Sequence, residues 1–220
     1  MRVLIGCEFS GVVRRAFRER GHDAWSCDVL PAEDESPYHV QGDVLDILEE
    51  NWDLAIFHPP CTYLCNSGAR WWRGRQMEQR HALAFVELLL HAPIPRIALE
   101  NPEGCISTRI RPPSQIIQPY HFGHDASKAT ALWLHQLPRL QPTCFVEASR
   151  MRCGACGTIF PACYGLYGCT CLSGRLARPI YANQTPSGQN KIGESPMRAR
   201  ARSRTYSGIA NAMALQWNLC

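Results

Sequence analysis

The chain has 220 residues and a formal net charge of +4, and 45% of its residues are hydrophobic. This length supports one domain with a sizeable core, and the composition excludes intrinsic disorder because apolar content is high and net charge is low. No stretch approaches the roughly 18–20 uncharged apolar residues that span a bilayer. The first residues also lack the pattern of a signal peptide. We therefore expect a cytoplasmic protein with no membrane partner.

Short apolar segments alternate with helical segments along the first half of the chain. Strands are predicted at residues 2–6, 23–27, 52–57 and 96–99, and a further short strand ends near 42–44. Helices are predicted at 12–20, 76–91 and 205–219, with a helical turn at 45–51, and Gly21 is the expected stop of the first helix. Strands that alternate with helices favour right-handed crossovers and a mainly parallel α/β sheet.

Polar and glycine residues stand directly after the predicted strands. They are Glu8 to Gly11, Asp28, Asp43, Pro60-Cys61 and Glu100-Asn101. In an open α/β sheet, ligands bind at the carboxyl ends of the strands. The order of these segments therefore predicts one ligand crevice at one edge of the sheet.

The first three of these segments suit a nucleotide-like cofactor. Gly11 would let the backbone approach a ligand closely, and Asp28 could accept hydrogen bonds from ribose hydroxyls. Asp43 could bind an adenine amino group. The alternative is that all three residues belong to ordinary turns.

Two further segments carry groups for covalent chemistry. Cys61 follows two prolines at a strand end, so it lies on a stiff turn that suits a nucleophile. Glu100 ends an apolar strand, where partial desolvation should raise the pKa of its carboxyl group and suit it to donate a proton. The alternatives are a buried structural cysteine and a turn cap formed by Asn101-Pro102.

In this order, the segments resemble motifs of the cytosine-5 DNA methyltransferases. Glu8-Phe9-Ser10-Gly11, Pro60-Cys61 and Glu100-Asn101-Pro102 resemble the cofactor loop, the Pro-Cys nucleophile motif and the Glu-Asn motif of that family. Residues 118–134 look like a later segment with a tyrosine-glycine turn and a basic motif, and 208–215 look like the last motif. The resemblance covers about 1–145 and 197–219 and is nearest to small phage or prophage members.

The resemblance implies a Rossmann-like S-adenosylmethionine-dependent methyltransferase sheet with a small Cys-rich zinc-binding insertion. The expected division is a catalytic core at 1–145, a target-contacting insertion at 146–196, and a basic arm and returning helix at 197–220. The expected setting is the cytoplasm of a bacterial or phage-infected cell. DNA, duplex or single-stranded, is the expected partner, and no obligate protein partner is evident.

The resemblance also implies the roles of individual residues. Cys61 would attack carbon 6 of a flipped or unpaired cytosine, Glu100 would donate at ring nitrogen 3, and Lys128 would stand in for the arginine of the basic motif. The cofactor-binding residues would be Glu8, Phe9, Ser10, Gly11, Asp28, Asp43, Pro60 and Asn211. The chain departs from the family in having few glycines in its first loop and a proline, Pro102, after the Glu-Asn pair.

Cysteine is unusually frequent, with 12 residues in the chain. A Cys-x2-Cys pair followed after a short loop by another close pair is typical of structural zinc in a reducing compartment. We predict that Zn²⁺ is bound by Cys153, Cys156, Cys169 and Cys171, with Cys163 as a substitute ligand. The alternative is a loop of reduced thiols.

Nucleic-acid contacts are expected at two basic segments. Trp71 and Arg73 follow the Cys61 loop and could stack on bases. Arg198, Arg200 and Arg202 alternate in sequence, so in an extended arm they would share one face and contact phosphates. The alternatives are a core tryptophan and a solvated surface run.

Three other functions stay open. The first is an amino-group (N4-cytosine or N6-adenine) DNA methyltransferase, although here His58 precedes the two prolines and Cys61 follows them. The second is a catalytically inactive, zinc-bearing DNA-binding protein. The third is the same methyl transfer on RNA or on a free nucleotide.

Overall fold

The computed structural model describes residues 1–163, 177–185 and 198–218. The chain divides into two compact units. The first contains Met1–Ile117, Ala129–Gln141 and Thr205–Cys220, and the second contains Gln118–Lys128 and Pro142–Arg204. Residues 118–128 and 198–204 thus belong to the second unit, whereas the boundaries expected from the sequence assign them to the core and to a separate arm.

The first unit is built on a seven-stranded sheet in the order β3-β2-β1-β4-β5-β7-β6. The strands are β1 (Arg2–Gly6), β2 (Asp23–Asp28), β3 (His39–Gln41), β4 (Leu54–Phe57), β5 (Ile97–Pro102), β6 (Gln115–Ile117) and β7 (Thr130–His135). The first five are paired in parallel, and β7 is antiparallel to both β5 and β6. This confirms the predicted mainly parallel α/β sheet.

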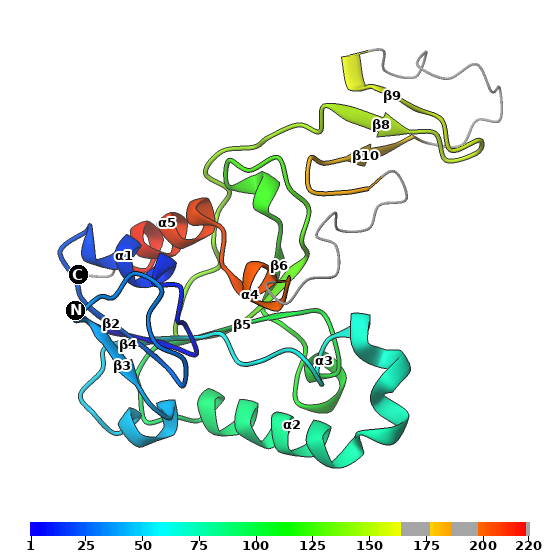
Figure 1. The fold of residues 1–220 in the computed structure, drawn as a ribbon. Helices are drawn as coiled ribbons and strands as arrows, with labels where there is room; N and C mark the ends of the chain where they lie inside the picture. The colour runs from blue at the N-terminus through cyan, green and yellow to red at the C-terminus, as the bar shows by residue number, and fades with distance from the viewer. Residues whose placement is uncertain (164–176, 186–197, 219–220) are drawn as a thin grey trace. The chain divides into compact units, whose positions relative to one another are not determined.

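Helices cover both faces of this sheet (Figure 1). The helices α1 (Val12–Arg18) and α5 (Ser207–Gln216) pack together on one face, and α2 (Gln76–Leu90) lies on the other. The central strands are buried on both faces, which explains why they read as continuous apolar runs. The predicted glycine stop is confirmed, because Gly21 has φ 80 and its N–H bonds to the Arg18 carbonyl at 2.9 Å.

Shorter elements join these helices and strands. They are the 3₁₀ helices η1 (Val44–Ile47) and η2 (Asn66–Gly74) and the short helix α3 (Ile106–Arg109). Among the described residues, no helix has the length and apolar character needed to cross a membrane.

The second unit contains a small antiparallel sheet in the order β10-β8-β9. Its elements are η3 (Pro119–His121), β8 (Arg150–Arg152), β9 (Ile159–Pro161), β10 (Arg178–Ile180) and α4 (Arg198–Ser203). The rings of Tyr120 and Tyr181 stack with their centroids 4.4 Å apart.

The prediction of an extended basic arm near residue 200 is wrong. Residues Arg198–Ser203 form α4, a short helix. Side chains two positions apart do not face each other on a helix, so Arg200 and Arg202 do not share the single face that an extended strand would give them. Arg202 is exposed, and Arg200 is half-buried.

Candidate active site

The loop after β1 turns its acidic side chain inward. Glu8 is buried, and its carboxylate accepts hydrogen bonds from the N–H groups of Val13 at 2.7 Å and Arg14 at 3.3 Å. The Ser10 hydroxyl donates to the same carboxylate at 3.3 Å. Because the first N–H groups of a helix lack intrahelical partners, Glu8 caps α1 and fixes the shape of this loop. Phe9 and Ser10 are also buried.

Gly11 lies where the loop enters α1, and its φ of 66 is a conformation that favours glycine. A Cβ atom there would lie 2.8 Å from an Asp34 carboxylate oxygen. Asp34 accepts hydrogen bonds from Arg14 and Arg15, each at 2.6 Å, and the Arg14 side chain is only 1% exposed. Burial alone would raise the pKa of Asp34, but the two arginines outweigh it and hold this pKa below its ordinary value.

The carboxyl ends of β1 and β2 bring acidic groups close to Cys7, the residue after β1. Cys7 has φ 60, a conformation uncommon outside glycine. Burial raises the pKa of its thiol, and the charges of Asp28, Cys27 and Asp43 raise it further. Asp28 and Asp43 therefore lie near the first loop, as the sequence order predicted.

Both acids also have structural partners. Asp28 is half-buried, and burial raises its pKa although the Leu30 N–H donates to it at 2.9 Å. Asp43 is exposed and caps η1 by accepting from the Leu45 N–H at 3.0 Å.

The segment after β4 holds Cys61 close to the end of β5. The His58 N–H bonds to the Gly6 carbonyl at 2.9 Å, which ties the segment to β1. Asn101 is buried, and its side-chain amide donates to the Pro59 carbonyl at 2.8 Å. Pro60 is exposed and Cys61 is half-buried, so the cysteine lies on a stiff turn that is still accessible.

Glu100 is buried at the end of β5 and has two partners that the sequence did not indicate. The His58 Nδ1 lies 3.2 Å from its Oε2 oxygen, and the Thr205 hydroxyl donates to the same oxygen at 3.2 Å. His58 could have been suspected from its place before the prolines. Thr205 could not, because it is 105 residues away along the chain.

The Cys61 segment and the loop after β5 are joined along their backbones. Cys65 and Gly104 form an isolated antiparallel bridge, and the Cys105 N–H bonds to the Leu64 carbonyl at 2.8 Å. The missing side chain of Gly104 is needed here, because a Cβ atom would collide with the Leu64 carbonyl. The turn also brings the Cys65 sulfur into hydrogen-bond contact with the Cys61 thiol.

The other predicted site residues lie on other elements of the chain. Lys128 belongs to the second unit, where its ammonium group donates to the Arg202 carbonyl at 3.1 Å. Asn211 is exposed on α5, and Arg73 is exposed on η2. The side chains of Trp71 and Arg198 lie outside the described part of the structure, whereas Trp72 packs against the core.

The first predicted zinc pair lies in a tight turn of the second unit. The Gly157 N–H bonds to the Cys153 carbonyl at 3.1 Å, and the Ala155 N–H points at the Cys153 sulfur at 3.4 Å. Cys153 is buried, whereas Cys156 and Cys163 are exposed. Cys169 and Cys171 lie outside the described residues. Within the described ranges, no group of three or more His, Cys, Asp or Glu side chains is placed to hold a metal ion.

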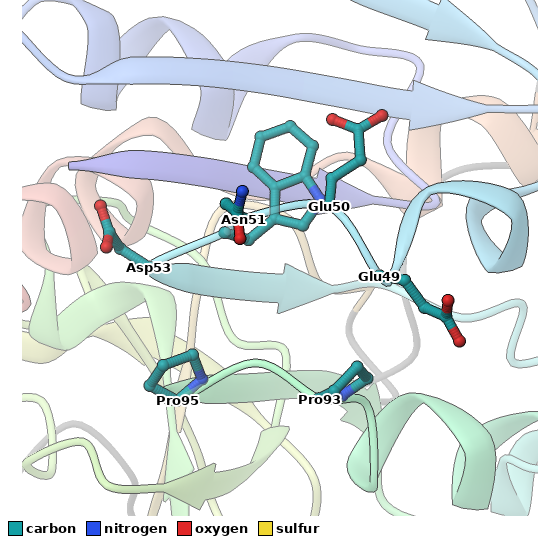
Figure 2. Close-up of a pocket in the computed structure, with 7 residues that line it drawn as sticks. Glu49, Glu50, Asn51, Asp53, Pro93 and Pro95 are labelled. Carbon is teal, nitrogen blue, oxygen red and sulfur yellow. The ribbon is translucent and has the colours of Figure 1, made fainter.

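A pocket of about 530 Å³ lies away from this site. It is lined by residues 49–53, which precede β4, and by Pro93 and Pro95, which precede β5 (Figure 2). It is therefore at the amino ends of these strands, whereas Cys61 and Glu100 are at their carboxyl ends. Acidic side chains surround it, and Arg2 already pairs with Glu50 at 2.9 Å.

Comparisons with known proteins give distant similarity to solved structures. No known protein family and no curated protein matches the chain. Among solved structures, it is similar to an E. coli protein assigned as a DNA modification methyltransferase encoded within a prophage, with a TM-score of 0.44 and 13% sequence identity. The similarity covers 67% of this chain and 52% of that chain, so this chain spans about half the length of that protein. A similarity of this degree does not assign a function, which is therefore inferred from the site itself.

Proposed function

We propose that this chain methylates carbon 5 of cytosine in DNA through a covalent adduct with Cys61. The observation that supports this most strongly is the pairing of Cys61 and Glu100 at neighbouring strand ends. They follow β4 and β5, which are adjacent and parallel, and the Asn101–Pro59 hydrogen bond of 2.8 Å connects the two segments. A nucleophile and an acid held side by side are what addition to an electron-poor ring requires.

In this proposal, the Cys61 sulfur forms a bond to carbon 6 of cytosine. The ring then becomes an electron-rich enamine, and Glu100 stabilises the charge that develops at nitrogen 3 by donating a hydrogen bond or proton. His58 and Thr205 hold the Glu100 carboxyl group through one oxygen. Loss of the carbon 5 proton after methylation would release Cys61. The base must leave the stack or be unpaired, because a duplex hides carbon 6.

S-adenosylmethionine would supply the methyl group that carbon 5 accepts. The residues at the ends of β1 and β2 fit such a cofactor. Asp28 has the position of the acid that binds ribose hydroxyls in dinucleotide folds, and Asp43 lies near the same edge. Phe9, Ser10, Gly11, Pro60 and Asn211 are the further proposed contacts. Glu8 would act by capping α1 and so shaping the loop around the cofactor.

The second unit would bind DNA and hold zinc in this proposal. Lys128, Arg200 and Arg202 lie in this unit and could neutralise phosphates. The Cys153–Gly157 turn, with an N–H group directed at a sulfur, suits a thiolate ligand of Zn²⁺. Cys169 and Cys171 would complete the site. The binding of DNA by Trp71, Arg73 and Arg198 is proposed on the sequence alone.

The test is methyl transfer from labelled S-adenosylmethionine to duplex and single-stranded DNA, followed by digestion and mass spectrometry of the nucleosides. We expect 5-methylcytosine, and we expect Cys61→Ala to abolish it. Cys144→Ala is a matched control, because Cys144 is an exposed cysteine in the second unit. Methylation at an exocyclic amino group, or transfer that survives Cys61→Ala, would refute the proposal. DNA binding without transfer would favour the inactive DNA-binding alternative.

A further inference from the structure

A second cysteine lies in the same turn as the proposed nucleophile. The N–H groups of Leu64 and Cys65 both bond to the Cys61 carbonyl at 3.0 Å, so the turn places residues 61 and 65 next to each other. Their side chains are in hydrogen-bond contact. Cys61 is half-buried, whereas Cys65 is only 8% exposed.

The surroundings of the Cys65 sulfur suit a negative charge. The Ser67 hydroxyl lies 3.0 Å from this sulfur. The hydrogen bond from the Cys61 thiol lowers the pKa of Cys65 most, burial opposes it, and Ser67 and the Gly68 N–H lower it further, so that the pKa is about 5. A thiolate that accepts several hydrogen bonds is stabilised relative to the thiol.

Another cysteine, Cys105, lies near Cys65. Cys105 is buried, and burial raises the pKa of its thiol, although the charge of Arg109 opposes this. The charge on Cys65 raises the pKa of Cys105 as well. Cys105 therefore stays a protonated thiol near Cys65, and the negative charge stays on Cys65.

We propose that Cys65 is a positioning residue that accepts the proton of Cys61 during attack, an inference that rests on the function proposed above. As the Cys61 sulfur bonds to carbon 6, its S–H bond breaks and the proton passes to the Cys65 thiolate, which becomes a thiol. The ring electrons move toward nitrogen 3 and Glu100. When the C–S bond later breaks, Cys61 leaves as a thiolate and recovers the proton from Cys65.

This arrangement would provide the deprotonation that Cys61 needs to act as a nucleophile. An ordinary cysteine is only a few per cent thiolate at about pH 7. A neighbouring thiolate lets Cys61 attack from its neutral form and still release its proton over one hydrogen bond.

The test is the rate at which iodoacetamide alkylates Cys61 in the full chain between about pH 4 and pH 9. Fragment ions of the digested protein separate alkylation at Cys61 from alkylation at Cys65. We expect Cys65→Ser and Cys65→Ala to lower the Cys61 rate at pH 6 by about tenfold or more. The midpoint of the pH profile should rise from near 5 toward the ordinary thiol value of about 8.5.

Ser67→Ala provides a second variant if the Cys65 variants do not fold, because Ser67 is exposed. It should shift the midpoint in the same direction but by less. Cys144→Ser should leave the profile unchanged. An identical Cys61 profile in the Cys65 and Ser67 variants would overturn the proposal.

Alkylation does not depend on methyl transfer, so the two experiments show which of the two proposals is wrong. If the profile shifts as expected while Cys61→Ala still methylates cytosine, the thiol pair stands as a chemical unit but its role in catalysis is overturned together with the proposed function. If Cys61→Ala abolishes methylation while the profile is unchanged, the proposed function stands and the role of Cys65 is overturned.

Discussion

At the scale of single residues, several polar side chains that look like ligand contacts in the sequence serve the fold. Glu8 caps α1, and Asp43 caps η1. Gly11 leaves space for the ion pairs between Arg14 and Asp34. The sequence places these residues correctly at the sheet edge, because strand ends are visible as breaks in apolar runs. It does not show which side chain points inward, since this depends on partners that only the folded chain brings close.

Asp34→Asn should destabilise the protein because it leaves the buried Arg14 charge without its carboxylate partner. Removal of one partner from a buried pair costs about 3–5 kcal/mol, and the 27% exposure of the Asp34 side chain reduces this to roughly 1–3 kcal/mol. Urea unfolding at pH 7 measures the change. Glu35→Gln is the matched control at the next position and should stay within about 0.5 kcal/mol of the native chain.

The same pair predicts a pH dependence. The pKa of Asp34 is lowered from 3.8 in the folded chain, so its contribution to stability is fully present above that value and is lost as the pH falls below it. The difference in stability between the native chain and Asp34→Asn should therefore shrink below about pH 4. A difference that stays constant down to pH 2 would contradict this account of the pair.

At the scale of elements, long periodic or strongly apolar segments were predictable and short ones were not. The strands β1, β2, β4 and β5 and the helices α1, α2 and α5 lie where the sequence predicts them. The three-residue strands β8, β9 and β10 were missed, since so few residues show no periodicity. Alternating arginines suggested an extended arm, but the segment Arg198–Ser203 is helical. A period-two charge pattern does not determine backbone conformation by itself.

Thr205, two residues before α5, makes a contact that only the structure indicates, because its hydroxyl donates to Glu100. Thr205→Val should lower kcat for methyl transfer by roughly tenfold, about the loss of one hydrogen bond to a charged group. Thr205→Ser should retain most of the activity, since it keeps the hydroxyl. Steady-state kinetics test this, with Ser207→Ala, an exposed position two residues on, as the control. An unchanged kcat in Thr205→Val would show that this hydroxyl does not support Glu100.

At the scale of the whole molecule, the chain combines a seven-stranded, mainly parallel α/β sheet with a smaller unit formed by two separate stretches of sequence. The fold class could be predicted because strand ends and helices follow in order. The composition of the second unit could not be predicted in full, since 118–128 and 142–204 associate through contacts far apart in sequence. One such contact is the stacking of Tyr120 on Tyr181.

Zinc content tests the proposed metal site of the second unit. The purified chain should contain about one equivalent of zinc, and Cys153→Ser should lose most of it, because structural sites need all four ligands. Elemental analysis by mass spectrometry measures this. Cys144→Ser, which alters an exposed cysteine of the same unit, should keep the metal. If the native chain contains no zinc after purification from a zinc-containing medium, the site does not exist.

The most direct test of the central claim is to trap the bond between Cys61 and cytosine. DNA in which every cytosine is replaced by 5-fluorocytosine removes the need to know the target sequence. Release of Cys61 requires a base to remove a proton from carbon 5, and a fluorine atom there cannot be removed in this way. The adduct should therefore persist when S-adenosylmethionine is present. Digestion and mass spectrometry should then find the modified nucleotide on Cys61 and on no other cysteine. Methylation of ordinary DNA together with no adduct, or an adduct on another cysteine, would contradict the account.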